Sequence, residues 1–280
     1  MRIVVVGSRG QLGAVMVEAC RAAHDVIAVD RSMLDVTQPS AVHEVMGRLT
    51  PDAIINCTGY NAVDAAEDHP VDALAVNAVA VRSMARAAAS LGAAFVHYST
   101  DFVFDGLATL PMAEEHPTNP RSVYAASKLL GEWLAMDASP AYVLRVESLF
   151  GEVSGAPPKG SLASIVGSLK AGQIPRVFED RVVSPTYVCD AAAATLALLE
   201  RRAPAGLYHC VNSGHATWLE VGQEAARLLG VSSAFDAVRF ADAKFPAARP
   251  QYCALANHKL QAAGATMPSW QDALARYLSR

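Results

Sequence analysis

The sequence predicts an α/β protein, with a Rossmann-type doubly wound parallel sheet and a smaller C-terminal substrate-binding lobe. Three observations predict this class. A run of β-branched residues, Ile3–Val6, leads into a glycine-rich turn and then a helical pattern. Short apolar strands alternate with helix-length amphipathic segments through the first 150 residues. The strands end in glycine, hydroxyl or acidic residues, as expected where the carboxyl ends of parallel strands bind a ligand.

The glycine-rich turn after the first strand predicts a phosphate-binding site. Gly7, Gly10 and Gly13 are spaced G-x-x-G-x-x-G and open a helical pattern. Glycine permits positive φ and lets backbone N–H groups approach a phosphate, which the helix dipole also favours. A plain turn that uses its glycines only for bending is the alternative. The residues expected to hold NADH or NADPH at this turn are Gly7, Arg9, Gly10, Gln11, Leu12 and Gly13.

The second predicted strand, 24–30, ends in an acid suited to cofactor binding. Asp30 lies 23 residues after Gly7, close to the roughly 20 expected for the acid that binds the ribose hydroxyls of NAD. Arg31 and Arg9 can instead hold the extra phosphate of NADP, so NADH and NADPH both stay open. A surface carboxylate without a cofactor role is the alternative for Asp30. In the following loop, Asp35 and its neighbour Val36 are expected near the adenine.

The next segments continue the strand and helix rhythm. A helix opens at Gln38-Pro39-Ser40, with the proline or the serine near its first turn. The alanine-rich stretch 70–91 predicts one long helix, although Asn77 inside it is a poor helix former with no local reason to be there. The remaining elements expected in this part are strands 52–59, 94–101 and 141–146 and a helix over 121–137.

The composition changes after residue 151, which predicts two domains. We expect 1–150 to be the NAD(P)-binding domain and 151–280 to be mainly the substrate-binding lobe, with the chain crossing back to the sheet. Thr217 and Glu220 form the pattern of a capping box at one helix start. The elements expected here are a loop over 154–160, a short strand over 206–211 and helices over 161–171, 190–202, 217–229 and 269–278.

Composition and charge exclude several classes of protein. A chain of 280 residues with 52% hydrophobic and 18% charged residues can bury a large core and is not disordered. A net charge of −4 gives no sign of nucleic-acid or membrane binding. No apolar run approaches the ~18 residues of a membrane span, and Met1-Arg2 is too short for the start of a signal peptide. Five scattered cysteines without C-x-x-C spacing argue against disulfides or zinc and predict a cytoplasmic protein.

Tyr124 and Lys128 carry the predicted chemistry. They stand four residues apart, on one face of the predicted helix. A phenol with a pKa of about 10 is a poor acid or base at neutral pH, and we expect the lysine ammonium to lower that pKa. Thr100, at a strand end, can present its hydroxyl to the same substrate oxygen. Beside a nicotinamide, these groups can polarise a carbonyl, supply a proton to the alkoxide and tune the proton donor.

These residues resemble the extended short-chain dehydrogenase/reductases and, within them, the dTDP-4-dehydrorhamnose reductase family. The resemblance covers nearly the whole chain. It implies reduction of the C4 ketone of a nucleotide-linked 4-keto-6-deoxy sugar by NADPH or NADH, with a monomer or homodimer as the working form. The segments that carry it are Gly7–Gly13, Ala62–Glu67, His97–Phe104, Tyr124-x-x-x-Lys128, Ser184–Thr186, Gly206–His209, Arg249–Pro250 and Pro268-x-Trp270.

Carried over to this sequence, the resemblance implies Thr100, Tyr124 and Lys128 as the catalytic set. Tyr124 would give its proton to the C4 oxygen. Asn77 would position Lys128 through water, or would only cap a neighbouring loop. The further residues implied at the cofactor are Thr58, Gly59, Tyr60, Asn77, Tyr124 and Lys128. The residues expected at the nucleotide sugar are Val63, Asp64, Thr100, Asp101, Phe102, Glu147, Ser148, Arg181 and Arg249.

The chain departs from the family pattern at two places. The family's fifth strand usually ends Arg-Thr-Ser-Trp-x-Tyr-Gly, with the tryptophan at the sugar. Here Ser148 replaces the indole, and Glu147 adds an acid that can bind a sugar hydroxyl or pair with an arginine. Some members dimerise through glutamates around a magnesium ion. Val15 stands at one such position, so we predict neither a metal-bridged dimer nor a metal site.

Two other functions compete with the reductase. Proteins with this fold also serve as non-catalytic regulatory or binding subunits, although such a subunit has no need of the intact Thr100, Tyr124 and Lys128. An epimerase or dehydratase that keeps its NAD tightly bound is the second alternative.

Overall fold

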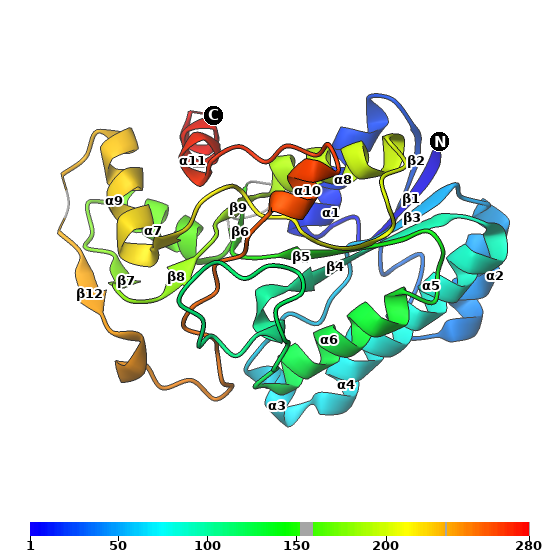
Figure 1. Ribbon diagram of the computed structural model, residues 1–280, viewed down its shortest axis with the longest axis horizontal. Coiled ribbons are helices and arrows are strands. Elements are labelled where there is room, and N and C mark those ends of the chain that lie inside the picture. The colour runs from blue at the N-terminus through cyan, green and yellow to red at the C-terminus, as the bar shows by residue number, and fades with distance from the viewer. Residues whose placement is uncertain (152–158, 233, 280) are drawn as a thin grey trace.

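A parallel sheet forms the centre of the molecule (Figure 1). The computed structural model describes residues 1–151, 159–232 and 234–279, so the predicted loop over 154–160 lies largely outside the described residues. Within them, six parallel strands pair in one sheet, which confirms the predicted fold class. Their order across the sheet is β10 (Gly206–His209), β5 (Ala141–Val146), β4 (Ala94–Thr100), β3 (Ala53–Asn56), β1 (Arg2–Val6) and β2 (Asp25–Val29).

Helices cover both faces of this sheet (Figure 1). One apolar cluster includes Ile3 and Val5 of β1 and residues of α1 and α8, and a second includes Val4 and Val6 with residues of α2 and α5. The alternation of β1 side chains between these clusters explains why its sequence is uniformly apolar. The helices flanking the sheet are α1 (Gln11–Arg21), α2 (Pro39–Leu49), α5 (Ala80–Leu91), α6 (Val123–Ala135) and α8 (Val188–Glu200).

The later part of the chain forms a smaller lobe beside the sheet (Figure 1). Within this part the chain also returns to the central sheet, because β10 pairs with β5 and α8 packs on α1. The helices of this part are α7 (Ser161–Lys170), α9 (Trp218–Leu229), α10 (His258–Ala262) and α11 (Trp270–Leu278), and the 3₁₀ turn η3 is Phe240–Asp242. Its short strands are β6 (Leu149–Phe150), β7 (Arg176–Phe178), β8 (Val182–Val183), β9 (Thr186–Tyr187), β11 (Ala216–Thr217) and β12 (Asp236–Val238).

The predicted long helix over 70–91 is interrupted at Asn77. It consists of α4 (Pro70–Leu74), the π-helical turn η1 (Ala75–Val79) and α5 (Ala80–Leu91), preceded by the short helix α3 (Ala65–Asp68). Single π turns inside α-helices often lie at functional sites. The side chain of Asn77 is buried and bonds outside its own helix, which gives the reason for an asparagine here that its local sequence lacks.

The third strand is shorter than the predicted 52–59 and ends at Asn56. The side-chain oxygen of Asn56 accepts the backbone N–H of Thr58 at 3.0 Å and the Thr58 hydroxyl at 2.6 Å. The strand therefore ends in a local turn held by the Asn56 side chain, a role that asparagine side chains commonly have. It directs Thr58 and the residues after it toward the carboxyl edge of the sheet.

Cys20, Cys57, Cys210 and Cys253 carry free thiols. Val15 lies on α1 and packs against the apolar core rather than standing free. None of the described helices is long and apolar enough to cross a membrane.

Candidate active site

The glycine turn forms a cradle at the start of α1. Gly7 has φ +82°, a conformation that side chains rarely adopt, and a Cβ built on Gly13 would lie 2.2 Å from the Gly7 carbonyl oxygen. Gly13 therefore lets the helix approach the turn, while Gly7 lets the chain bend away from β1. The backbone N–H groups at the start of α1 are left for a phosphate. These contacts explain why the turn needs its glycines, and phosphate binding there stays a prediction.

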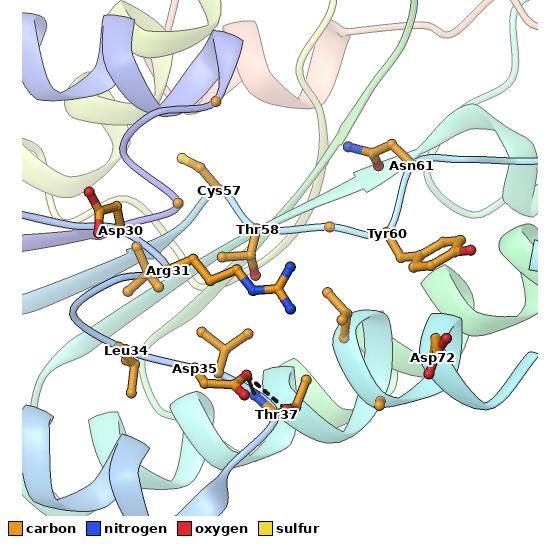
Figure 2. A pocket seen from close by; sticks show the side chains of 17 residues that line it. Asp30, Arg31, Leu34, Asp35, Thr37, Cys57, Thr58, Tyr60, Asn61 and Asp72 are labelled. Carbon is orange, nitrogen blue, oxygen red and sulfur yellow. Dashed lines mark hydrogen bonds between the residues drawn. The ribbon is translucent and has the colours of Figure 1, made fainter. Parts of the chain in front are cut away.

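A cavity of about 700 Å³ opens beside this cradle at the carboxyl ends of β1, β2 and β3. Figure 2 shows the Arg31 side chain extending across it, between the segments 35–37 and 57–60. Predicted residues that line it are Gly7, Gly10, Asp30, Arg31, Asp35, Val36, Thr58, Gly59 and Tyr60. Residues that the sequence did not single out are Val6, Leu34, Thr37, Cys57, Asn61, Asp72, Ala75 and Val76. Of these, Asp72, Ala75 and Val76 lie on α4 and the π turn just before or beside Asn77, and no spacing in the sequence marks them.

Two carboxylates that line this cavity, those of Asp30 and Asp35, already accept hydrogen bonds from neighbouring residues. Asp30 pairs with the Arg9 guanidinium at 2.6 Å and accepts from the backbone N–H and hydroxyl of Ser32. These hydrogen bonds and Arg9 hold the pKa of Asp30 below its usual value. Asp35 accepts from the backbone and hydroxyl of Thr37 in the same way. Arg9 and Arg31 also line a second hollow of about 220 Å³ next to Asp30.

The other predicted cofactor residues do not line these hollows. Gln11 donates from its side-chain amide to the Gly151 carbonyl at 2.9 Å, and Leu12 is buried in the core. Asn77 accepts the backbone N–H of Tyr60 at 2.8 Å and donates to the Tyr60 carbonyl and the Ser127 hydroxyl. It therefore caps the loop at Tyr60, the second of the roles considered for it.

Helix α6 carries Tyr124 and Lys128 against the π turn. A Cβ on Gly131 would lie 2.1 Å from the Asn77 carbonyl oxygen, so this glycine permits the close packing. Lys128 is buried, and its ammonium donates to the Tyr98 carbonyl in β4. Tyr124 belongs to a small apolar cluster against which Tyr60, a cavity residue, packs, and its ring meets that of Phe102 edge-on. Tyr124 thus shares a cluster with a residue that lines the cavity.

The electrostatics of this pair differ from the expectation. Burial raises the pKa of Tyr124, the charge of Asp101 raises it further, and the Thr100 hydroxyl lowers it. Burial lowers the pKa of Lys128 to about 8, which Glu132 opposes. Lys128 is not a cause of the Tyr124 shift, so the predicted lowering of the phenol pKa by Lys128 is wrong. Burial disfavours the charged form of each group, so the phenol pKa rises and the ammonium pKa falls.

The predicted sugar residues come from segments far apart in sequence. Arg249 binds Asp64 with two hydrogen bonds of 2.7 and 2.8 Å, and the pKa of Asp64 falls to about 2 because of these bonds and one from the Ala247 backbone. This contact joins the C-terminal segment to the loop before α3. Val63 and Phe102 pack against the apolar cluster that contains Tyr124, and the Arg181 guanidinium lies 5.9 Å from the Phe102 ring centre.

Glu147 and Ser148 lie in the segment where the sequence departs from the family pattern. Glu147 is buried and accepts the backbone N–H of Ser184, while the Ser148 hydroxyl donates to it at 3.2 Å. Asp101 lies in the turn η2 (Asp101–Val103), where its carboxylate accepts the Thr100 hydroxyl at 2.9 Å. Sequence reasoning missed Cys253, whose sulfur lies within 4.8 Å of carboxylate oxygens of both Asp101 and Glu147.

Comparison with known proteins places this geometry in one family. The model of the RmlD substrate binding domain matches residues 1–280. The chain belongs to this family. A dTDP-4-dehydrorhamnose reductase of Streptomyces griseus is 35% identical, over 98% of this chain and 91% of its own. A probable dTDP-4,6-dihydroxy-2-methyloxan-3-one 4-ketoreductase of Streptomyces antibioticus is 34% identical, over 98% and 93%.

A solved structure agrees with this assignment. The dTDP-4-dehydrorhamnose reductase of Bacillus anthracis str. Ames in complex with NADP is 29% identical, has a TM-score of 0.90 and aligns over 99% of this chain and 97% of its own. The family resemblance read from the sequence is therefore confirmed, as is the prediction of an NAD(P)H-dependent oxidoreductase.

Proposed function

We propose that this chain reduces the C4 ketone of a nucleotide-linked 4-keto-6-deoxy sugar, using NADPH or NADH. The observation that carries the proposal is that Tyr124, which the Thr100 hydroxyl contacts, shares a small apolar cluster with Tyr60. Tyr60 also lines the 700 Å³ cavity. A dinucleotide in the cavity and a sugar at Tyr124 would then share one reaction space.

The residues at the cavity fit a nicotinamide dinucleotide. The glycine turn and the N-terminus of α1 form a cradle that suits the pyrophosphate. A Cβ on Gly13 would fill this cradle. Asp30 and Arg31 stand where the adenosine ribose of such a cofactor is recognised, and Asp35 and Val36 would lie at the adenine. The bound cofactor supplies the hydride.

Tyr124 is the proton donor for the C4 oxygen. Because burial raises its pKa, the phenol stays protonated at neutral pH and holds the proton that a reduction consumes. The Thr100 hydroxyl, beside the phenol, provides a hydrogen bond that polarises the carbonyl. Lys128 is held by the Tyr98 carbonyl and places a positive charge beneath the site.

The sugar nucleotide would lie between the two lobes. Val63 and Phe102, which pack against the cluster of Tyr124, would give the sugar an apolar wall. Arg181, with no hydrogen-bond partner for its buried Nε, can meet an oxygen of the substrate. The ion pair of Asp64 and Arg249 would close the pocket by holding the two lobes together.

An NAD(P)H-oxidation assay against a panel of nucleotide 4-keto sugars tests this function. We expect oxidation to depend on the sugar, with one equivalent of alcohol formed for each cofactor consumed. Purified protein that already absorbs in the nicotinamide band, and converts sugars without net oxidation, would instead indicate the epimerase or dehydratase. No turnover with any member of the panel would support the regulatory subunit.

A further inference from the structure

A polar pair, Asn56 and His97, interrupts an apolar face of the central sheet. Asn56 of β3 and His97 of β4 stand directly opposite each other where these strands pair, and both are fully buried. The residues two positions earlier, Ile54 and Phe95, belong to the apolar cluster on this face. Buried polar side chains are costly unless they are hydrogen-bonded, so the bonds of this pair determine its role.

The hydrogen bonds of Asn56 fix the orientation of its amide. Its side-chain oxygen accepts the backbone N–H and the hydroxyl of Thr58, at 3.0 and 2.6 Å. The amide nitrogen therefore faces His97, with 3.1 Å between Asn56 Nδ2 and His97 Nδ1. Because an amide nitrogen donates and does not accept, the imidazole Nδ1 is the acceptor of this bond.

The same contact determines which nitrogen of His97 carries a proton. Since Nδ1 accepts, the neutral ring is protonated at Nε2. Burial and the nearby charge of Lys128 hold the pKa of His97 well below its usual value, which keeps the ring neutral. The ring stacks with that of Phe95, and a Cβ on Gly131 of α6 would lie 3.3 Å from Nε2. The imidazole is therefore confined between the sheet and the helix that carries Tyr124.

Thr58 connects this pair to the cavity at the glycine turn. It lines the cavity (Figure 2), and its hydroxyl proton is used in the bond to Asn56. With the hydroxyl held there, the Thr58 methyl lies against the turn, because a Cβ built on Gly7 would be 3.0 Å from Thr58 Cγ2. The side-chain conformation of Thr58 therefore bears on the turn that the cofactor phosphates would approach.

We propose that His97 is a positioning residue for the cofactor and acts on it through Asn56 and Thr58. By accepting the Asn56 N–H, the imidazole keeps the amide oxygen on Thr58, and Thr58 in turn supports the glycine turn at Gly7. Without that acceptor the Asn56 amide can rotate, and Thr58 loses the bonds that hold its side chain. The inference rests on the cofactor site of the proposed function and concerns affinity for NADPH. It does not depend on the chemistry at Tyr124.

Equilibrium titration with NADPH tests this role without a sugar substrate. His97→Leu keeps a side chain that can fill most of the space and removes the acceptor. We expect it to raise the Kd for NADPH by ~3–10-fold, the usual net effect of one hydrogen bond. Thr58→Val removes the hydroxyl at the other end of the chain of bonds. The double variant should bind NADPH about as well as the weaker single variant, because both changes break the same chain.

His97→Asn separates positioning from packing. Oδ1 of the introduced asparagine is as many bonds from the backbone as the histidine Nδ1, so it can still accept the Asn56 N–H. The smaller side chain leaves a void, which should lower the unfolding temperature, while the Kd for NADPH should stay nearly unchanged. His209→Leu is the matched control, since His209 is also a fully buried imidazole but contacts Ala256 and Arg145. It should leave the Kd for NADPH unchanged.

The protonation of His97 gives a second test, in the unmodified protein. NMR spectra of the imidazole nitrogens should show Nε2 protonated and Nδ1 unprotonated at neutral pH. A proton on Nδ1, an unchanged Kd in His97→Leu, or an equal rise of Kd in His97→Asn and His97→Leu would each overturn the positioning role. The proposed function fails differently, through tight binding of NADPH with no oxidation by any 4-keto nucleotide sugar. Unmodified protein that binds neither NADPH nor NADH would remove the foundation of both.

Discussion

The cofactor side and the substrate side of the proposed active site differ in burial and in how their polar groups are paired. On the cofactor side the cavity is open, and the carboxylates of Asp30 and Asp35 have local partners. On the substrate side, Tyr124, Lys128 and Asp101 are buried, and the buried Asp101 oxygen and Arg181 Nε lack hydrogen-bond partners. Buried polar groups are costly unless a partner arrives, so the substrate side is arranged for events that occur only with substrate present.

This contrast has a practical meaning for mutations. A cofactor-side residue acts mainly on affinity, since its interactions are screened and shared among neighbours. A substrate-side residue acts on the rate, because a charge or proton there has no substitute nearby. The comparison is correct only if variants on the cofactor side change mainly affinity and variants on the substrate side change mainly the rate.

Tyr124→Phe should give the largest effect and tests the substrate side most directly. Removing the phenol proton should lower kcat by ~10²–10⁴-fold, the usual worth of general acid catalysis. Thermal unfolding should change little, because the ring and its contact with Phe102 remain.

Tyr142→Phe is the control, since its buried hydroxyl donates to the Ala203 carbonyl at 2.8 Å. It should keep normal turnover. Near-full activity in Tyr124→Phe would move the donor to another group, of which Asp101 is the first to examine.

The alkaline limb of the pH profile should report Lys128. Burial lowers the pKa of Lys128 to about 8, so its ammonium is lost as the pH rises through this value. We expect kcat to fall above pH 8, by at most ~10-fold for each further unit of pH. In Lys128→Arg the guanidinium stays charged, and the fall should move to higher pH even if turnover is lower. An inflection unchanged in Lys128→Arg would assign it to a different group.

The sequence predicts the cofactor side better than the substrate side for a physical reason. Strand β1, the glycine turn and α1 are contiguous, and glycine spacing and periodicity report their geometry directly. Asp30 follows at the end of the adjacent strand. The cavity residues at 72–76 were missed because the sequence does not reveal which face of a helix a π turn exposes.

The substrate side depends on contacts between distant segments. Asp101, Glu147, Arg181 and Cys253 span much of the chain, and no local pattern relates them. Likewise, the hydrogen bonds of Asn77 to Tyr60 and Ser127 explain why an asparagine stands there, and the sequence alone does not show them. The expected effect of Lys128 on Tyr124 was wrong because helical spacing gives proximity but not the depth of burial that controls both pKa values.

Asp30→Ala tests the cofactor side and should have a modest effect. The carboxylate favours free ribose hydroxyls and repels a phosphate, but Arg9 and Ser32 already bind it. We expect the KM for NADPH to fall relative to that for NADH by several-fold at most, because an exposed ion pair contributes little. Asp25→Ala, at the other end of β2 and paired with Arg2, is the control. An unchanged KM ratio would show that Asp30 does not act on the ribose.

Ser148→Trp should give the smallest effect and tests the wall of the sugar pocket. An indole stacked on a pyranose buries apolar surface and fixes the tilt of the ring. With Ser148 there, the pocket should be wider and more polar, which favours a related, more substituted nucleotide sugar over dTDP-4-keto-rhamnose. Restoring the indole should improve dTDP-4-keto-rhamnose relative to the preferred substrate by a few-fold.

The structure sets a limit on how large that gain can be. Ser148 has φ +42°, and its hydroxyl donates to Glu147. A tryptophan must adopt the same left-handed backbone, which is unfavourable for a bulky residue, and it leaves that Glu147 oxygen without this donor. Part of the stacking energy is therefore lost to strain.

The unmodified protein decides whether the substitution altered specificity at all. If the open wall disfavours dTDP-4-keto-rhamnose, its kcat/KM should lie well below that for the best member of a nucleotide-sugar panel. A kcat/KM of ~10⁵ M⁻¹s⁻¹ or more with dTDP-4-keto-rhamnose, as for an efficient enzyme, would contradict the prediction. Specificity would then come from parts of the pocket other than Ser148, with Arg181 and Phe102, which lie 5.9 Å apart, as the next positions to vary.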